Sequence, residues 1–91
     1  MKGSAKLAWI LVKASYIATQ EAALSLAAEL TAMDQVRRVD VVSGEYALLV
    51  AVAGSADDVE AVEQFLAGRL ESEEAYDTCE FIATRADKDW P

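Results

Sequence analysis

The side chains that perform most enzyme chemistry are scarce in this chain of 91 residues. It contains one cysteine, Cys79, and neither histidine nor asparagine, so the commonest general base and the nucleophilic triads built around it are missing. Cys79 stands between Thr78 and Glu80, without an identifiable base to activate it, and free cysteines are commonly small core residues. We therefore expect no catalytic residue in this sequence.

Metal and cofactor sites find equally little support. A single thiolate without histidine does not assemble a usual zinc site. The paired carboxylates Asp57-Asp58 and Glu73-Glu74 fall at expected helix ends, where acidic side chains are favourable or simply solvated. The 4 glycines do not recur at phosphate-loop spacing. We expect no metal and no cofactor.

Two other features have residue types that could bind a ligand. The adjacent Arg37 and Arg38 could hold an anion, although a salt bridge to one of the 16 acidic residues is the alternative. Residues 43–46, Ser-Gly-Glu-Tyr, form a turn whose backbone amides can point outward beside the amphipathic ring of Tyr46. An ordinary turn, with Tyr46 as a packing residue, is the competing interpretation.

Length and composition limit what the chain can be. Its 91 residues fit one core, and we expect a single domain over residues 1–91, with its core at about 7–84 and a solvated tail at 87–91. The net charge of −8 repels nucleic-acid phosphates, which argues against direct DNA or RNA binding. The only N-terminal apolar run, residues 7–12, is closed by Lys13 and is too short for a signal or membrane segment. We expect a cytoplasmic protein.

The order of elements follows from hydrophobic periodicity. Residues 7–14 predict a buried strand, and Thr19 is the expected N-cap of a helix over about 20–33. Residues 36–42 and 47–53 predict a hairpin around Gly44, after which Asp57 and Glu60 have the chemistry of a capping box that opens a second helix. A last strand is expected over residues 76–84. This order predicts an α+β fold, a ferredoxin-like βαββαβ sandwich whose two helices cover one face of a four-stranded antiparallel sheet.

Two expected strands are apolar on both faces. An antiparallel sheet with one wet face alternates apolar and polar residues, yet residues 47–53 are apolar throughout and residues 9–12 read Trp-Ile-Leu-Val. Because two helices cover only one face, a second copy of the chain is the simplest cover for the other. The residues expected on that dimer face are Trp9, Leu11, Leu49 and Ala51.

A family resemblance rests on the hairpin. Residues 39–52, Val-Asp-Val-Val-Ser-Gly-Glu-Tyr-Ala-Leu-Leu-Val-Ala-Val, resemble the central hairpin of the Lrp/AsnC ligand-binding domain, also called the RAM domain. The similarity extends over about residues 7–84. It implies a dimer formed through the sheets, a further ring such as an octamer, and an amino acid bound near the hairpin loop. The ligand-binding candidates that it implies are Ser43, Gly44, Glu45, Tyr46 and Ala47.

The sequence departs from the family pattern at two points. Ala47 stands where the pattern usually has an aspartate, and only six residues precede the first expected strand, where full-length members carry a DNA-binding helix-turn-helix. The resemblance therefore implies a stand-alone effector-binding and oligomerisation module, linked to transcriptional regulation of amino-acid metabolism and able to assemble with full-length regulators. The alternatives are a ligand-free oligomeric adaptor and a dimeric α/β-barrel enzyme of the monooxygenase-like type.

Overall fold

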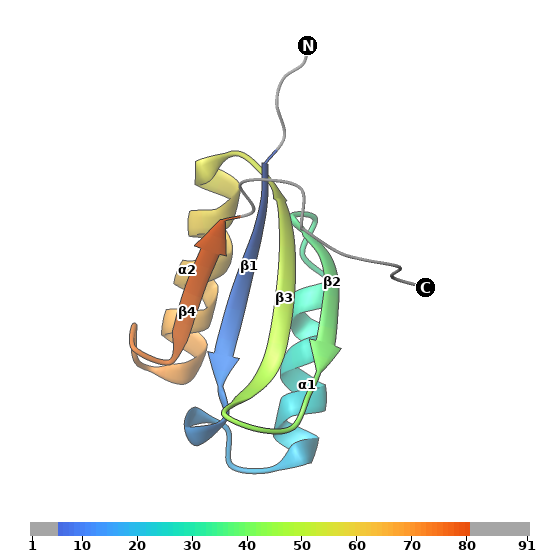
Figure 1. Cartoon of the computed structure of the whole chain (residues 1–91), viewed down its shortest axis with the longest axis vertical. Coiled ribbons are helices and arrows are strands. Elements are labelled where there is room, and N and C mark those ends of the chain that lie inside the picture. Colours follow the sequence, from blue (N-terminus) through green and yellow to red (C-terminus); the bar gives the residue numbers. More distant parts are fainter. Residues whose placement is uncertain (1–5, 81–91) are drawn as a thin grey trace, which may run out of the picture.

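The computed structural model describes residues 6–80. Its elements follow the expected order (Figure 1): β1 (Lys6–Lys13), a short 3-10 turn η1 (Ala14–Tyr16), α1 (Gln20–Thr31), β2 (Val36–Val41), β3 (Tyr46–Gly54), α2 (Ala56–Leu70) and β4 (Tyr76–Glu80). The part of the expected last strand at 81–84 and the tail at 87–91 lie outside the described residues. Helix α1 ends at Thr31, two residues before the expected end.

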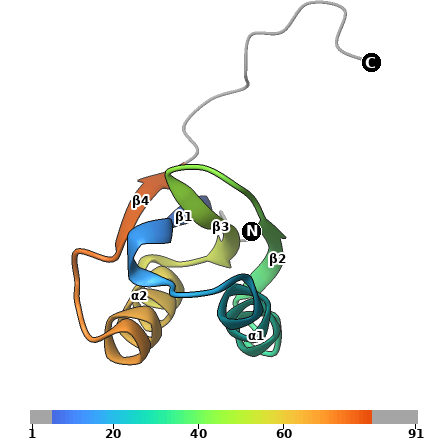
Figure 2. The same ribbon diagram turned by 90° about the horizontal axis from the view of Figure 1, so that it is seen from below.

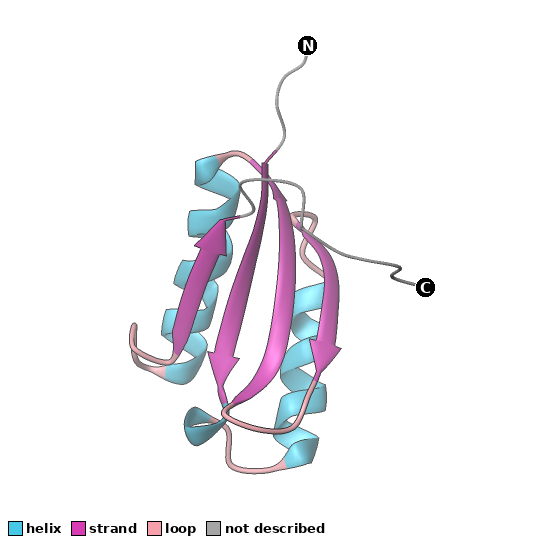
Figure 3. Ribbon diagram, viewed as in Figure 1, coloured by secondary structure: helices cyan, strands magenta, loops and turns pink. Residues whose placement is uncertain are grey.

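The four strands form one antiparallel sheet in the order β2-β3-β1-β4. Figure 3 shows β1 and β3 as the central pair, with β2 and β4 at the two edges. The centre of the sheet is thus built from the two most apolar segments of the chain, as the burial of central strands requires. This confirms the predicted α+β, ferredoxin-like sandwich.

Both helices pack against the same face of the sheet, as Figure 2 shows from below. Ile10, Val12 and Val50 are fully buried there, and helix α2 contributes Val62 and Leu66. Each Å² of apolar surface buried in this layer contributes about 25 cal/mol to the stability of the fold. The remaining members of the buried cluster are Ala23, Leu26, Leu30, Val36, Leu48 and Val52.

The helix starts are set by side-chain caps. Thr19 accepts a hydrogen bond from the Ala22 amide at 3.0 Å, which confirms it as the N-cap of α1. The expected capping box of α2 was wrong by two residues: its N-cap is Ser55, and Asp58 returns the bond to the Ser55 amide at 2.8 Å. Gly54 permits this cap: it has a φ of +144°, and a Cβ at this position would collide with the Asp58 carboxylate that bonds the Ser55 amide.

Within residues 6–80, neither helix is long and apolar enough to cross a membrane.

Candidate ligand pocket and sheet interface

A β-bulge at the start of β3 decides which way the hairpin side chains point. Val12 of β1 pairs with Leu48, but the next residue, Lys13, pairs with Tyr46, so Ala47 is an extra residue in β3. Such a bulge breaks the alternation of the strand. As a result, Ala47 and Leu48 both lie toward the helix layer, and Tyr46 lies on the opposite face of the sheet.

A pocket of about 470 Å³ lies where the hairpin meets the beginning of α1. This volume is in the range of small-molecule sites. One wall comes from the hairpin and the end of β2, and the other from the β1–α1 connection and the first turn of α1. We call it the hairpin pocket; its lining residues are Ala14, Ile17, Ala18, Thr19, Gln20, Ala23, Val41, Val42, Ser43, Gly44 and Ala47.

The hairpin pocket has few polar side chains. Thr19, Gln20 and Ser43 supply two hydroxyl groups and one amide, and the Thr19 hydroxyl already accepts the Ala22 amide as the cap of α1. The rest of the lining is aliphatic or glycine, and Val41 and Val42 remain partly exposed at the rim. Such a wall favours a small ligand with an aliphatic body and a polar end.

The predicted ligand loop is divided between two places. Ser43, Gly44 and Ala47 line the hairpin pocket. Glu45 is exposed at the turn, where its carbonyl accepts a hydrogen bond from the Ala14 amide at 2.9 Å. Tyr46 does not reach the pocket, because the bulge turns its ring to the other side of the sheet.

Sequence reasoning missed the second wall of this pocket. Thr19 was recognised as a helix cap, but nothing in the sequence placed it beside Ser43. The contact exists because the β1–α1 connection returns across the end of the sheet next to the hairpin, where the Ala14 amide bonds the Glu45 carbonyl. Thr19 and Gln20 thus join a loop that follows them by more than twenty residues in the chain.

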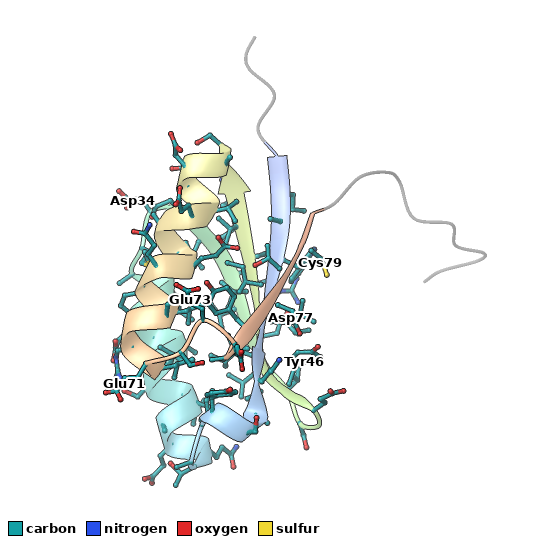
Figure 4. The ribbon with its side chains drawn as sticks, turned by 90° about the vertical axis from the view of Figure 1, so that its left-hand side faces the viewer. Asp34, Tyr46, Glu71, Glu73, Asp77 and Cys79 are labelled. Carbon is teal, nitrogen blue, oxygen red and sulfur yellow. The ribbon has the colours of Figure 1, made fainter. Side chains whose placement is uncertain are left out.

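Tyr46 and Asp77 meet on the face of the sheet that the helices leave uncovered. The Tyr46 hydroxyl donates a hydrogen bond of 2.8 Å to Asp77 Oδ2, which spans β1 and joins β3 to β4. Figure 4 shows both side chains, and Cys79, on the side away from the helices. The hydrogen bond to the carboxylate is the main reason why the pKa of Tyr46 is raised.

We call this uncovered side of the sheet the open face. Trp9 pairs with Ala51 and Leu11 pairs with Leu49 in the β1–β3 ladder, so the four residues predicted to form the dimer face are contiguous. The edges of the face are polar: Arg38 and Asp40 of β2 form a salt bridge of 3.0 Å, and Asp77 and Cys79 lie on β4. An apolar centre between polar edges is the usual anatomy of a protein–protein interface.

The arginines and the cysteine that were considered as functional residues lie on the edge strands of the sheet. Arg38 pairs with Asp40, as the salt-bridge alternative predicted, while Arg37 is exposed at the irregularity between Val36 and Arg38. Cys79 is exposed on β4, so the expectation of a small core residue was wrong. Its place opposite Trp9 at the edge of the sheet, without a helix above it, explains the exposure.

The helix layer carries its own ion pair. Arg69 of α2 holds Glu29 of α1 through two hydrogen bonds of 2.8 and 2.6 Å. These bonds lower the pKa of Glu29 and raise that of Arg69.

A second pocket of about 410 Å³ lies beside this pair, between η1, α1 and the end of α2. Among residues 6–80, no cluster of acidic or cysteine side chains has the arrangement of a metal site.

Comparisons with solved structures support the fold. The chain is similar to the crystal structure of PH0061, with a TM-score of 0.66 and 17% identity over 92% of this chain and 56% of that chain. It therefore spans little more than half of the PH0061 chain, and at this identity the likeness concerns the fold alone.

Two smaller structures match along nearly their whole length. For the hypothetical protein PHS023 from Pyrococcus horikoshii the TM-score is 0.50 and the identity 26%, over 89% of this chain and 92% of that chain. For FFRP-DM1 the TM-score is 0.50 and the identity 28%, over 87% of this chain and 99% of that chain. None of the curated proteins matches the chain.

The family assignment comes from a match to a family model described as the Lrp/AsnC ligand binding domain, which covers residues 8–84. The matched span contains the hairpin on which the resemblance was based and all of the predicted core at about 7–84 except its first residue. The chain belongs to the Lrp/AsnC ligand binding domain family.

Proposed function

We propose that the chain is a non-catalytic, cytoplasmic effector module that binds a small molecule in the hairpin pocket and associates with itself through the open face. The observation that carries the proposal is the bulge at Ala47, because it makes neighbouring residues of one strand face the pocket and the open face. Ala47 lines the pocket, while its neighbour Tyr46 lies on the open face and bonds Asp77. A ligand in the pocket and a partner on the sheet would therefore both touch the same hairpin.

The apolar open face supports a homodimer, and further assembly of dimers into a ring is part of the proposal. Trp9, Leu11 and Leu49 are only half-buried in the single chain, although they occupy the centre of the sheet. Covering them with the same residues of a second copy would remove this apolar surface from water. Such pairing through one self-complementary patch is the rule for two-fold homodimers.

The net charge bears on how the module would act in transcription. With −8 overall, the chain is repelled by the DNA backbone. We propose that it acts on genes of amino-acid metabolism through mixed assembly with full-length Lrp/AsnC regulators and does not contact DNA itself. The ligand would be an amino acid or a related metabolite.

A second candidate function is a ligand-free adaptor that keeps the assembly and lacks the effector. The observation that favours it is the scarcity of polar side chains in the hairpin pocket. The two functions differ in one measurable respect, which is whether any metabolite stabilises the folded chain.

A thermal-shift titration against the amino acids and related metabolites tests the proposal, since a ligand that binds only the folded state raises the unfolding midpoint. The Gly44→Val variant should abolish the shift, because Gly44 has a φ of +141°, which a β-branched residue rarely adopts. No atom lies within 4 Å of a Cβ added there, so the expected effect is on the loop conformation and is not a clash.

Gly68→Ala in α2 is the matched control, because an added Cβ there also meets no atom within 4 Å and the residue is helical. This variant should keep the ligand shift. Unchanged affinity in Gly44→Val would place the site elsewhere, and a wild-type chain that no compound stabilises would favour the adaptor.

A further inference from the structure

The hairpin pocket is electrically neutral in a chain rich in charge. Charged residues make up 26% of the sequence, yet none of the side chains that line this pocket in the described part of the chain is acidic or basic. Glu21, Asp40 and Glu45 each stand next to a lining residue in the sequence, but none of the three lines the pocket. A ligand held here would meet hydroxyl, amide and aliphatic groups only.

This neutrality matters for an α-amino acid, which carries an ammonium group at neutral pH. Taking an ammonium group out of water is costly unless a carboxylate or several acceptors replace its hydration. The side chains of Thr19, Gln20 and Ser43 offer neutral oxygens only, and the Thr19 oxygen already accepts one hydrogen bond from the Ala22 amide. The pocket therefore lacks a counter-charge for this group.

Ala47 occupies the position from which a counter-charge would act. Its relative exposure is 9%, and the bulge directs it into the pocket between the hairpin and α1. A carboxylate at this point would be a charged group in the lining of the pocket. The methyl group present instead adds to its aliphatic wall.

The start of α1 disfavours positive charge at the same place. Gln20 is the first residue of the helix and lines the pocket, so the positive end of the helix dipole borders the ligand space. The helix dipole and the absence of a carboxylate thus both disfavour an ammonium group in the pocket.

We propose that the hairpin pocket selects a small aliphatic metabolite that has no ammonium group, such as the α-keto acid of a branched-chain amino acid. Ala47 is the specificity-determining residue, because the bulge directs this side chain into the pocket and it is an uncharged methyl group. The proposal rests on the proposed ligand site and narrows its ligand class.

Calorimetric titration of the wild-type chain with matched pairs tests the selectivity. Leucine, isoleucine and valine are each compared with their own α-keto acids, which keep the side chain and the carboxylate and lack the ammonium group. For at least one pair we expect the keto acid to bind roughly tenfold tighter or more, a factor that corresponds to about 1.4 kcal/mol. An amino acid that binds as tightly as its keto acid overturns the inference and leaves the ligand site intact.

Two variants of Ala47 separate charge from size. Ala47→Asp should reverse the preference in favour of the amino acid, because it restores a counter-charge to the pocket. Ala47→Asn has nearly the same shape without the charge, so it should weaken both ligands without reversing their order. Reversal in both variants, or in neither, contradicts a role for the charge at this position. Failure of all six compounds to bind the wild-type chain would overturn the inference, while the proposed ligand site would fall only if no compound of the thermal-shift titration stabilised the chain.

Discussion

The two faces of the central strands have nearly the same apolar character and opposite environments. On β1 and β3, Ile10, Val12 and Val50 are fully buried under the helices, while Leu11 and Leu49, on the same strands, are half-buried on the open face. The difference lies in what covers each face. An all-apolar strand therefore indicates that both faces need a cover, while the topology decides which face the chain covers by itself.

The sharpest test of this contrast uses two adjacent leucines on opposite faces. Leu48→Ala opens a cavity under the helices and should lower the free energy of unfolding by about 2–5 kcal/mol at any protein concentration, because Leu48 is fully buried within one chain. Chemical denaturation followed by circular dichroism measures this loss.

Leu49→Ala removes the same atoms from the open face. Its effect should be much smaller within one chain, where Leu49 is only half-buried, and should depend on protein concentration if the proposed self-association covers the rest of the side chain. Equal and concentration-independent losses in the two variants would contradict a difference between the faces.

The second prediction concerns association. Leu11→Lys places a charge at the centre of the open face, opposite Leu49 in the ladder. A charge buried in an apolar interface without a partner is strongly unfavourable, so we expect self-association to weaken by roughly a hundredfold, about 2.7 kcal/mol. Light scattering over a dilution series measures the mass.

Arg37→Lys is a control for this experiment, because Arg37 is exposed on the edge strand and the charge is kept. It should associate like the wild-type chain. A wild-type chain that is monomeric at micromolar concentration would refute the assignment of the open face as an interface.

The smallest expected effect concerns the ionisation of Tyr46 on the open face. The hydrogen bond from Tyr46 to Asp77 raises the pKa of Tyr46 above its ordinary value of 10.0. A raised folded-state pKa means that the stability from this contact is fully present below pH 10 and is lost as the pH rises through the higher, folded value. Burial also raises the pKa of Tyr76, so phenolate absorbance against pH should show the delayed ionisation of both tyrosines.

Two variants test whether Tyr46 and its hydrogen bond to Asp77 account for part of this delayed ionisation. Tyr46→Phe should remove the contribution of Tyr46 to the delayed phase and leave that of Tyr76. Asp77→Asn should shift the ionisation of Tyr46 toward ordinary values, since the negative acceptor is gone. If Asp77→Asn left the titration unchanged, another group would have to account for the raised pKa.

Local sequence signals predicted the elements well where only one nearby residue could fill a structural role, such as a helix cap or a turn. Thr19 caps α1 as expected, and the hairpin around Gly44 forms where glycine is needed for a positive φ. The second capping box was misplaced because Ser55, Asp57 and Asp58 are all suitable caps. In the structure Ser55 is the N-cap and Asp58 accepts a hydrogen bond from its amide, in space that the absence of a side chain at Gly54 leaves free.

The candidate site was less accessible to sequence reasoning. The hairpin residues were identified, but the bulge at Ala47 separates Tyr46 from Ser43 and Gly44. A bulge reverses which face of the sheet each following side chain occupies. Because the residues of β3 are apolar on both faces, their pattern looks the same with or without a bulge. Nothing in that pattern could therefore show where the alternation breaks.

By itself, the sequence determined the order of elements, the apolar character of the central strands and the neutral residue at position 47, because these depend on residue type and local spacing. Tertiary structure alone decided that Thr19 and Gln20 face the hairpin, that Tyr46 crosses β1 to reach Asp77, and that Cys79 is exposed. These outcomes depend on how distant segments meet across the sheet, where packing of the whole chain fixes the register and outweighs local preference.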